Sequence, residues 1–295
     1  MTSSGAGALP SSARTDDWTG AAAHSWVRMT AWTNLAFAPF DAHLLAAADC
    51  RDGHRVLDVG CGSGATTLAV AGQVGRSGQV VAVDVAAAMC TAAEAAAEAG
   101  GLSQVSVMNA DAATATFGPA PFDRVVSRFG TMFFADPAAA FGHIRSAMAS
   151  DATLTFVSFG ARTANPWIDL PVSVLARHLP AGRNVGPDPM AFSLSDPDRI
   201  SAILTDAGFT DVRTTRLSAD VTLGGGAGPE AAAQHLLGME FPARVLRLVD
   251  SAYRADAVAD LERELGRHAG TAGVSLPAQA LLTSARPGRR QDRPA

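Results

Sequence analysis

The residues best suited to chemistry lie at positions 56–64, which read Val-Leu-Asp-Val-Gly-Cys-Gly-Ser-Gly. An apolar run that contains one acid leads into three glycines at alternate positions, Gly60, Gly62 and Gly64. Glycine has no Cβ, so such a bend can adopt positive φ and can let a ligand press against the backbone. A strand that ends in this way and feeds a helix is typical of a nucleotide-binding turn.

The turn alone does not identify the nucleotide. A Gly-x-Gly-x-x-Ala pattern begins at Gly60, and Asp84 follows about 20 residues later, where an acid binds ribose in dinucleotide sites. Two further acids favour a different adenosine cofactor. Asp58 stands just before the first glycine, where dinucleotide sites are usually apolar, and Asp111 follows the third expected strand, where a carboxylate can accept a hydrogen bond from an adenine amino group. The bend is also tight enough for a small polar tail.

The elements around these residues alternate between strand and helix, which indicates a parallel, doubly wound sheet. We expect strands at 55–59, 79–83, 105–108, 123–127 and 153–159, and helices at 65–71, at 86–99 and after Asp136-Pro137. Beyond residue 159 this alternation of strands and helices ends. Five prolines predict a broken segment at 160–195, followed by a helix at 196–207, a strand at 209–217, helical patterns from 229 to 268 and a last strand at 278–285.

Composition limits the function classes. The net charge of −5 argues against a nucleic-acid partner, and all 23 basic residues are arginine, which excludes chemistry on a lysine Schiff base. The three cysteines have neither metal-ligand spacing nor the pattern of a disulfide framework, and no acidic or histidine cluster predicts a metal. We find no signal peptide and no apolar segment of spanning length, so we expect a cytoplasmic protein that does not enter a membrane.

Four segments together resemble the class I S-adenosylmethionine-dependent methyltransferases, most of all the quinone C-methyltransferase type and its relatives in bacterial secondary metabolism. The resemblance covers roughly residues 50–160 and rests on Val56–Gly64, Val81–Val85, Asn109–Ala112 and Phe122–Phe134. Asn165-Pro166-Trp167 and residues 273–287 match more loosely. One departure is Ala-Ser-Asp-Ala at 149–152, where the family often has a Pro-Gly-Gly turn before strand five.

This resemblance implies a fold and a division of the chain. The expected class is α/β, with a doubly wound, mostly parallel seven-stranded sheet of Rossmann-like type, a helical N-terminal lid and cap insertions. We expect a disordered tail at 1–17, an aromatic-rich helical lid at 18–48, a cofactor-binding core at 49–160, the remainder of the core with a substrate cap at 161–286 and a tail at 287–295.

The resemblance also implies S-adenosyl-L-methionine as cofactor and assigns residues to it. Its methionine part would be wrapped by Gly60, Gly62, Ser63 and Gly64. Asp84 would hold the ribose hydroxyls, and the adenine would meet Val85, Met89, Asp111 and Ala112. Ser127 would face the sulfonium end.

We therefore expect methyl transfer to a small organic molecule, most plausibly a secondary metabolite, driven by positioning in a dry pocket. No catalytic base is assignable, and the candidates are His24, His43, His178 and His235, with Arg128 as a guide for an anionic substrate. Three alternatives stay open: a cyclase of the same fold that binds the cofactor without transferring its methyl, an NAD-dependent oxidoreductase, and a binding module without catalysis. A homodimer is possible.

Overall fold

A computed structural model describes residues 20–181, 185 and 191–288, and gives no side-chain detail for residues 20–26 and 240. The expected tails and Trp18 therefore lie largely or wholly outside the described residues, as do the side chains of His24 and Trp26. Within the described part, no helix is both long enough and apolar enough to traverse a bilayer.

The core is one mixed sheet whose strands follow the order β3-β2-β1-β4-β5-β8-β6. The parallel half consists of β1 (Arg55–Val59), β2 (Gln79–Asp84), β3 (Val105–Asn109), β4 (Phe122–Arg128) and β5 (Met148–Phe159). The antiparallel half adds β8 (Gly273–Pro287) between β5 and β6 (Phe209–Leu223). The predicted α/β class with a mostly parallel sheet is confirmed, and the sheet has eight strands because a two-residue strand β7 (Ala269–Gly270) is attached to β8.

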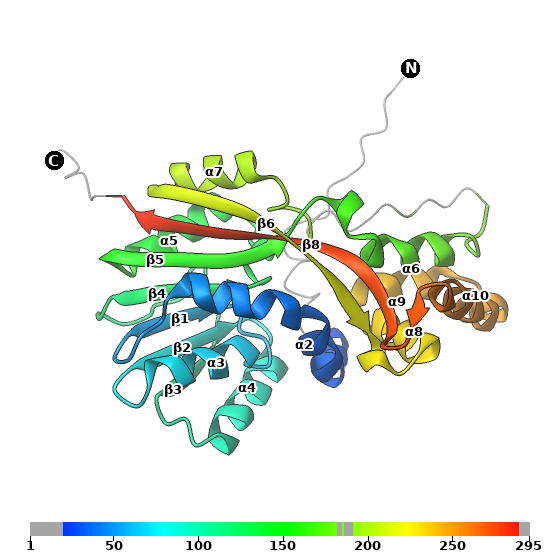
Figure 1. Cartoon of the computed structure of the whole chain (residues 1–295), viewed down its shortest axis with the longest axis horizontal. Coiled ribbons are helices and arrows are strands. Elements are labelled where there is room, and N and C mark those ends of the chain that lie inside the picture. The colour runs from blue at the N-terminus through cyan, green and yellow to red at the C-terminus, as the bar shows by residue number, and fades with distance from the viewer. Residues whose placement is uncertain (1–19, 182–184, 186–190, 289–295) are drawn as a thin grey trace.

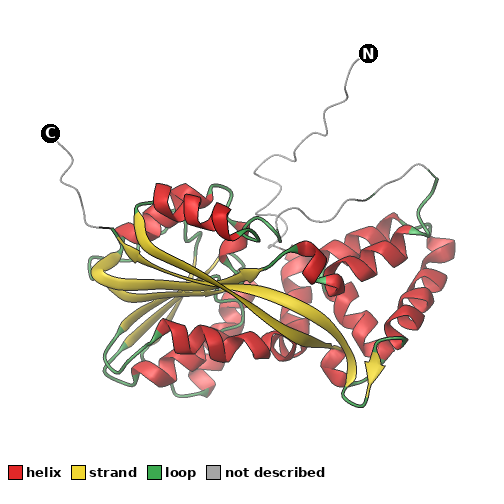
Figure 2. Cartoon of the chain, turned by 45° about the horizontal axis from the view of Figure 1, so that its top comes forward, coloured by secondary structure: helices red, strands yellow, loops and turns green. Residues whose placement is uncertain are grey.

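Helices cover both faces of this sheet because successive strand residues point to opposite sides. One face carries α2 (Gly20–Ala48), α3 (Ala65–Val74) and α4 (Ala87–Ala99), and the other carries α5 (Pro137–Ser146) and α7 (Pro197–Asp206), as Figures 1 and 2 show. The neighbours Val56 and Leu57 illustrate this division, since each is fully buried but belongs to a different hydrophobic cluster.

A group of helices lies at one end of the sheet, where the long strands β6 and β8 extend beyond their neighbours (Figure 1). This cap contains α6 (Pro166–Ala176), α8 (Pro229–Gly238), α9 (Glu240–Leu248) and α10 (Arg254–Gly266). Val172 and Leu175 of α6 pack with Val245, Val249 and Ala257 in a small hydrophobic core of their own.

The segment at 160–195 corrects one sequence expectation. Its prolines do not break it throughout, because Pro166 occupies the start of α6, where no backbone N–H is needed, and Pro171 is buried inside the same helix. The strands at 153–159, 209–217 and 278–285 are also longer than predicted. The Ala-Ser-Asp-Ala sequence lies within β5, at a register shift between β4 and β5, instead of forming a separate turn.

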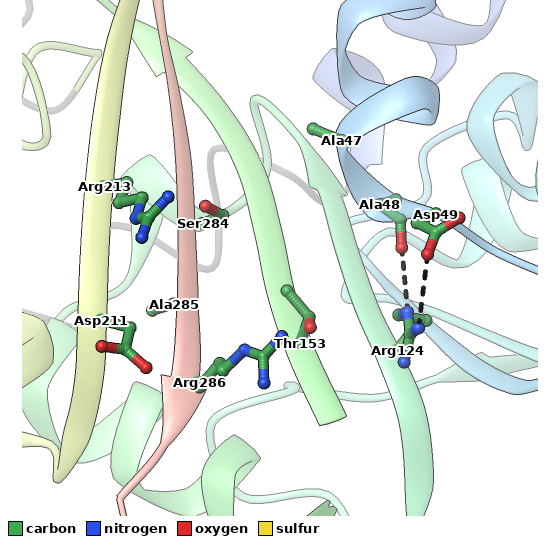
Figure 3. A pocket seen from close by; sticks show the side chains of 10 residues that line it. All are labelled: Ala47, Ala48, Asp49, Arg124, Thr153, Asp211, Arg213, Ser284, Ala285 and Arg286. Carbon is green, nitrogen blue, oxygen red and sulfur yellow. Dashed lines mark hydrogen bonds and ion pairs between the residues drawn. The ribbon is translucent and has the colours of Figure 1, made fainter. Parts of the chain in front are cut away.

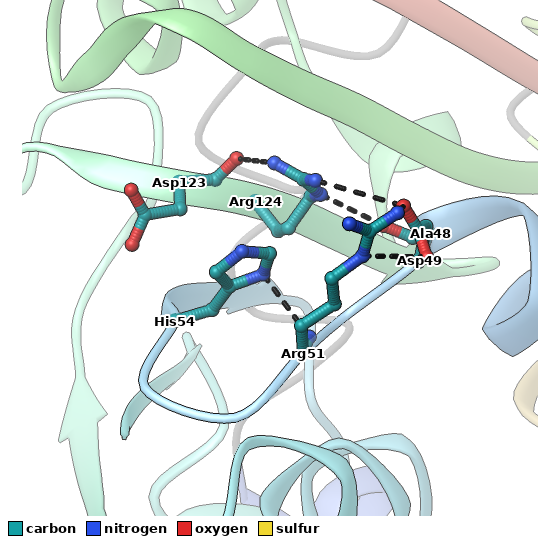
Figure 4. A network of polar contacts seen from close by, with 6 residues as sticks. All are labelled: Ala48, Asp49, Arg51, His54, Asp123 and Arg124. Carbon is teal, nitrogen blue, oxygen red and sulfur yellow. Dashed lines mark hydrogen bonds and ion pairs between the residues drawn. The ribbon is translucent and has the colours of Figure 1, made fainter. Parts of the chain in front are cut away.

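The C-terminal end of α2 is held at the amino edge of the parallel strands by a polar network (Figure 4). Arg124 of β4 donates through Nε to the Ala48 carbonyl at 3.0 Å, so a carbonyl that the helix end leaves unpaired finds a partner. Asp49 adopts φ +47° just beyond the helix and accepts from Arg51 at 2.6 Å and 3.1 Å. Helix α2 is thus anchored at this end.

Asn165 joins three elements at the opposite edge. Its side chain is fully buried, and Nδ2 donates to the carbonyls of Ala161 and Gln279, both at 3.1 Å. Oδ1 accepts from the Gln279 N–H at 3.0 Å and from the Trp167 indole at 3.2 Å. One amide therefore links the end of β5, the start of α6 and the middle of β8.

We predict that Asn165→Ala lowers the free energy of unfolding by about 3 kcal/mol, because it leaves several buried donors and acceptors without partners. Urea denaturation followed by circular dichroism measures this change. Thr163→Ala, at an exposed position in the same turn, serves as the control and should leave the midpoint nearly unchanged. Equal midpoints for Asn165→Ala and the wild type would contradict the role given to this amide.

Candidate active site

The glycine bend follows β1 at the carboxyl edge of the sheet. Gly60, Gly62 and Gly64 all have positive φ, at +67°, +54° and +91°. A Cβ on Gly60 would lie 2.7 Å from the Gly130 Cα, so only glycine fits there, whereas the Cβ position of Gly62 has no atom within 4 Å. The bend is therefore packed on one side and open on the other, which makes a cradle for a ligand.

Asp84, at the end of β2, is tied directly to this bend. Its Oδ2 accepts from the Gly62 N–H and its Oδ1 from the Ala86 N–H, both at 2.9 Å. Burial raises the pKa of the carboxyl, and these two hydrogen bonds partly offset that effect. The end of β3 joins the same unit, because the Asn109 amide donates to the Asp84 carbonyl at 3.0 Å.

Asp58 lies in β1, two residues before Gly60, and is fully buried. The Thr67 hydroxyl donates to its Oδ2 at 2.6 Å, while Oδ1 has no hydrogen-bond partner among the described residues. Burial raises the pKa of this carboxyl to about 6. A buried acceptor without a partner is rare in folded proteins, and here it stands two residues before the cradle.

The other residues assigned to the cofactor lie near the same strand ends. Val85 and Met89 are half-buried after β2, and Ser63 is half-buried within the bend. After β3, Asp111 is exposed and accepts from the Ala113 N–H at 2.8 Å, and Ala112 is buried beside it. The structure thus brings these predicted residues to the carboxyl ends of β1, β2 and β3.

Ser127 does not face this space. Its side chain is fully buried in β4, and its hydroxyl donates to the Val59 carbonyl at 2.7 Å. The hydroxyl is thus bonded to the backbone here, and its contact with the sulfonium end of a cofactor stays a prediction. The hydroxyl joins the ends of β1 and β4 just before Gly60 and Gly130, which supports the bend from behind.

Two of the candidate bases have structural partners. The His235 Nδ1 accepts from the Gly224 N–H at 3.2 Å, and its Nε2 lies 3.4 Å from the Thr33 hydroxyl. The ring is fully buried, and burial lowers its pKa to about 4. His178 lies 2.8 Å from Asp260 within the cap. Of the remaining two, His43 is exposed on α2, and the side chain of His24 lies outside the described part.

Arg128, expected to guide an anionic substrate, is instead paired with helix α2. Its Nη1 lies 3.0 Å from a carboxylate oxygen of Asp41, and its Nη2 donates to the Asn34 amide oxygen at 2.5 Å. The side chain is mostly buried, so the guanidinium holds α2 against the end of β4. Burial nevertheless raises the pKa of Asp41, and Arg128 lowers it in part.

Four buried rings, which we call the aromatic cluster, lie at the ends of β4 and β5: Phe37, Phe129, Phe159 and Trp167. The centroid of Phe129 lies 4.7 Å from that of Phe37 and 4.6 Å from that of Phe159. Trp167 lies 5.4 Å from Phe159 and 5.8 Å from Phe37. Phe37 lies in the aromatic-rich segment 18–48 that we expected as a lid, whereas sequence reasoning did not assign Phe129 or Phe159 to the site, although Phe129 directly precedes Gly130.

Phe129 carries backbone strain at this edge. Its φ is +61°, a conformation that costs a bulky residue about 1–3 kcal/mol. Its N–H still donates to the Val157 carbonyl at 3.0 Å, and its ring is held among its aromatic neighbours. The packing therefore keeps this ring at the end of β4, beside the Gly60–Gly130 contact.

A cavity of about 380 Å³ lies elsewhere, at the amino edge of the strands (Figure 3). Its lining includes Arg124, Thr153, Arg213, Ser284 and Arg286. These residues occupy the starts of β4, β5 and β6 and the end of the antiparallel β8. The cavity is thus separated by the length of the strands from the glycine bend, and we do not include it in the candidate site.

Comparison with known proteins supports a single family. A family model described as "Methyltransferase domain" matches residues 56–151. Nocamycin O-methyltransferase of Saccharothrix syringae is 32% identical over 249 residues, covering 79% of this chain and 85% of that protein.

Solved structures share the fold at lower identity. YcgJ of Bacillus subtilis has a TM-score of 0.55 and 16% identity, over 84% of this chain and 98% of that chain. The [4+2]-cyclase SpnF has a TM-score of 0.52 and 20% identity, over 84% of this chain and 81% of that chain. The family match removes the NAD-dependent alternative.

We predict that His235 stays neutral in the folded protein and makes stability depend on pH. Its pKa falls from the ordinary 6.5 to about 4 on folding, so between these values the unfolded chain binds more protons. The stability that neutral His235 supports is complete above pH 6.5 and is lost as the pH falls toward 4, by about 2 kcal/mol between pH 7 and pH 5.

The measurement is urea denaturation at pH 7 and pH 5 for the wild type and for His235→Gln. The difference between the two proteins isolates this histidine from Asp58, whose raised pKa acts in the opposite direction. The wild type should lose more stability than the variant on acidification. Equal losses would show that His235 does not titrate below its ordinary pKa.

Proposed function

The chain belongs to the class I S-adenosylmethionine-dependent methyltransferases, and from that premise we propose that it methylates an oxygen atom of a small secondary metabolite. The proposed substrate class rests on the extent of the similarity to Nocamycin O-methyltransferase. That similarity spans 249 residues, far more than the 56–151 segment matched by the family model, so it includes parts outside the cofactor core. Acceptor selectivity in such folds resides in those parts, since the same core serves many reactions.

S-adenosylmethionine is the cofactor, and it supplies an already activated methyl group on a sulfonium centre. The residues present fit it, because the open side of the Gly62 bend leaves room for a ligand and the unpaired Oδ1 of Asp58 adds an acceptor below it. Gly60, Gly62, Ser63 and Gly64 would hold the methionine part, Asp84 the ribose, and Val85, Met89, Asp111 and Ala112 the adenine.

The chain's contribution to the reaction is positioning and the exclusion of water. The aromatic cluster closes the ends of β4 and β5 next to the bend, and each of its rings is at most 8% exposed. A dry apolar site favours a reaction in which charge is dispersed, and an aligned acceptor gains most of its rate from proximity. The His178 ring is paired with Asp260, and the His235 ring contacts the Gly224 N–H and the Thr33 hydroxyl. We therefore assign neither histidine as a base.

The proposal is tested by incubating the full chain with S-adenosylmethionine and a panel of hydroxylated secondary metabolites. Mass spectrometry should detect S-adenosylhomocysteine and an O-methylated product in equal amounts. SpnF shows that this fold can also carry a cyclisation. Conversion of an acceptor without formation of S-adenosylhomocysteine would therefore refute methyl transfer for that acceptor and support the cyclase alternative.

We predict that Asp84→Asn weakens S-adenosylmethionine binding by about 10–100-fold, because a hydrogen bond to a charged carboxylate is worth about 1.5–3 kcal/mol. The amide preserves the size of the side chain but removes its charge. Isothermal titration calorimetry measures the dissociation constant directly.

The matched control is Asp52→Asn, which changes an exposed acid at the amino edge that accepts from Ser77 at 2.8 Å. It should bind the cofactor like the wild type. If Asp84→Asn also binds like the wild type, Asp84 does not hold the ribose.

A further inference from the structure

The four rings of the aromatic cluster are held in two different ways. Phe129 and Phe159 stand at the ends of β4 and β5, and Trp167 is fixed because its indole Nε1 donates to the buried Asn165 at 3.2 Å. These three rings therefore belong to the sheet edge and to the start of α6. Phe37 alone comes from the lid helix α2.

Phe37 is the one ring of the cluster whose displacement would leave the sheet edge and the start of α6 in place. C-terminal to Phe37, the end of α2 is anchored by the hydrogen bond that Arg124 donates to the Ala48 carbonyl. Two residues beyond Phe37 stands Pro39, which cannot donate the helical hydrogen bond at that point and so weakens the helix locally. On the same stretch of α2, Asp41 and Asn34 pair with Arg128, and the buried ring of Phe40 lies 6.0 Å from that of Phe129.

The Phe37 side chain occupies a space between three other aromatic rings. Its centroid lies 4.7 Å from Phe129, 5.8 Å from Phe159 and 5.8 Å from Trp167, within the range of favourable aromatic pairs. No polar group of these three side chains is left to face the space, because the only one, the Trp167 indole N–H, is already bonded to Asn165.

We propose that the acceptor of this enzyme is a flat, π-rich ring system that takes the place of the Phe37 side chain between Phe129, Phe159 and Trp167. The proposal rests on the proposed function, since it describes the substrate of that same site. The three fixed rings select flat skeletons by stacking and edge contacts, and they disfavour puckered saturated skeletons of the same size. Displacement of Phe37 lets the acceptor reach the end of β4, next to the Gly60–Gly130 contact.

The test compares 1-naphthol with decahydro-1-naphthol, which share a carbon skeleton and a hydroxyl group but differ in flatness. Calorimetry with the full chain saturated with S-adenosylhomocysteine gives both dissociation constants without turnover. We expect 1-naphthol to bind at least about tenfold more tightly, as two or three aromatic contacts would provide. Equal binding of the two alcohols would overturn the proposal.

Two variants assign the effect to the cluster. Trp167→Leu should remove the preference for 1-naphthol, and Phe37→Leu should increase the affinity for 1-naphthol because less side chain must be displaced. An unchanged preference in Trp167→Leu would overturn the proposal, and so would weaker 1-naphthol binding in Phe37→Leu, since Phe37 would then be a wall of the bound state.

The matched control is Phe141→Leu, which removes a buried ring that packs on Phe156 away from the cluster and should leave the preference intact. If a variant fails to fold, the two alcohols on the wild type still decide the question. Binding of S-adenosylhomocysteine is measured first, in a separate titration of each protein. Its absence would refute the proposed function, whereas its presence without a preference between the alcohols would refute only the flat acceptor.

Discussion

The close approach of two backbones, at Gly60 after β1 and at Gly130 after β4, is the constraint on which the site depends. A Cβ on Gly60 would lie 2.7 Å from the Gly130 Cα, and one on Gly130 would lie 2.8 Å from the Gly60 Cα. The hydrogen bond from Ser127 to the Val59 carbonyl draws the two strand ends together just below this contact. The bend therefore opens on its other side, at Gly62, and the ring of Phe129 is carried to the edge at a strained φ.

This constraint explains why the two halves of the site differ in character. The half beside β2 and β3 is built from polar groups that bond one another, such as Asp84 with Gly62 and Asn109 with the Asp84 carbonyl. The half beside β4 and β5 is apolar, because the aromatic cluster covers it. A cofactor with many polar groups suits the first half, and an acceptor placed in the second would be shielded from water.

The sequence predicted the first half well and the second poorly, for physical reasons. Glycines at alternate positions and acids after apolar strands are local signals, so the bend, Asp84 and Asp111 could be placed from chain order alone. The role of Ser127 depends on which residue lies opposite it in the neighbouring strand, which periodicity does not reveal. Arg128 and His235 likewise find partners in α2, about 90 and 200 residues away in the chain, and only the fold brings them together.

The same limit applies to the overall fold. Alternating strands and helices identified the parallel sheet through β5, where each element follows its neighbour. The helix α6 was missed because proline was read as a breaker, whereas Pro166 stands at a helix start and tertiary packing tolerates Pro171. The long strands β6 and β8 were underestimated because the exposed, polar residues of β6 lack a continuous apolar pattern, and pairing with β8 extends that strand.

Electrostatics supplies an argument about the ligand that is independent of any motif. Two carboxylates lie at the bend, the fully buried Asp58 and the half-buried Asp84, and desolvation raises the pKa of both. The Thr67 hydroxyl and the Arg128 charge lower the pKa of Asp58 in part, and the Asp84 charge adds a smaller rise. A pyrophosphate placed against such a bend would meet like charge in a poorly hydrated site, whereas a ligand with cationic ammonium and sulfonium groups would stabilise both ionised acids. Asp58, the acid of this pair that sets the turn apart from a dinucleotide site, is thus one of the groups that would favour a positively charged cofactor there.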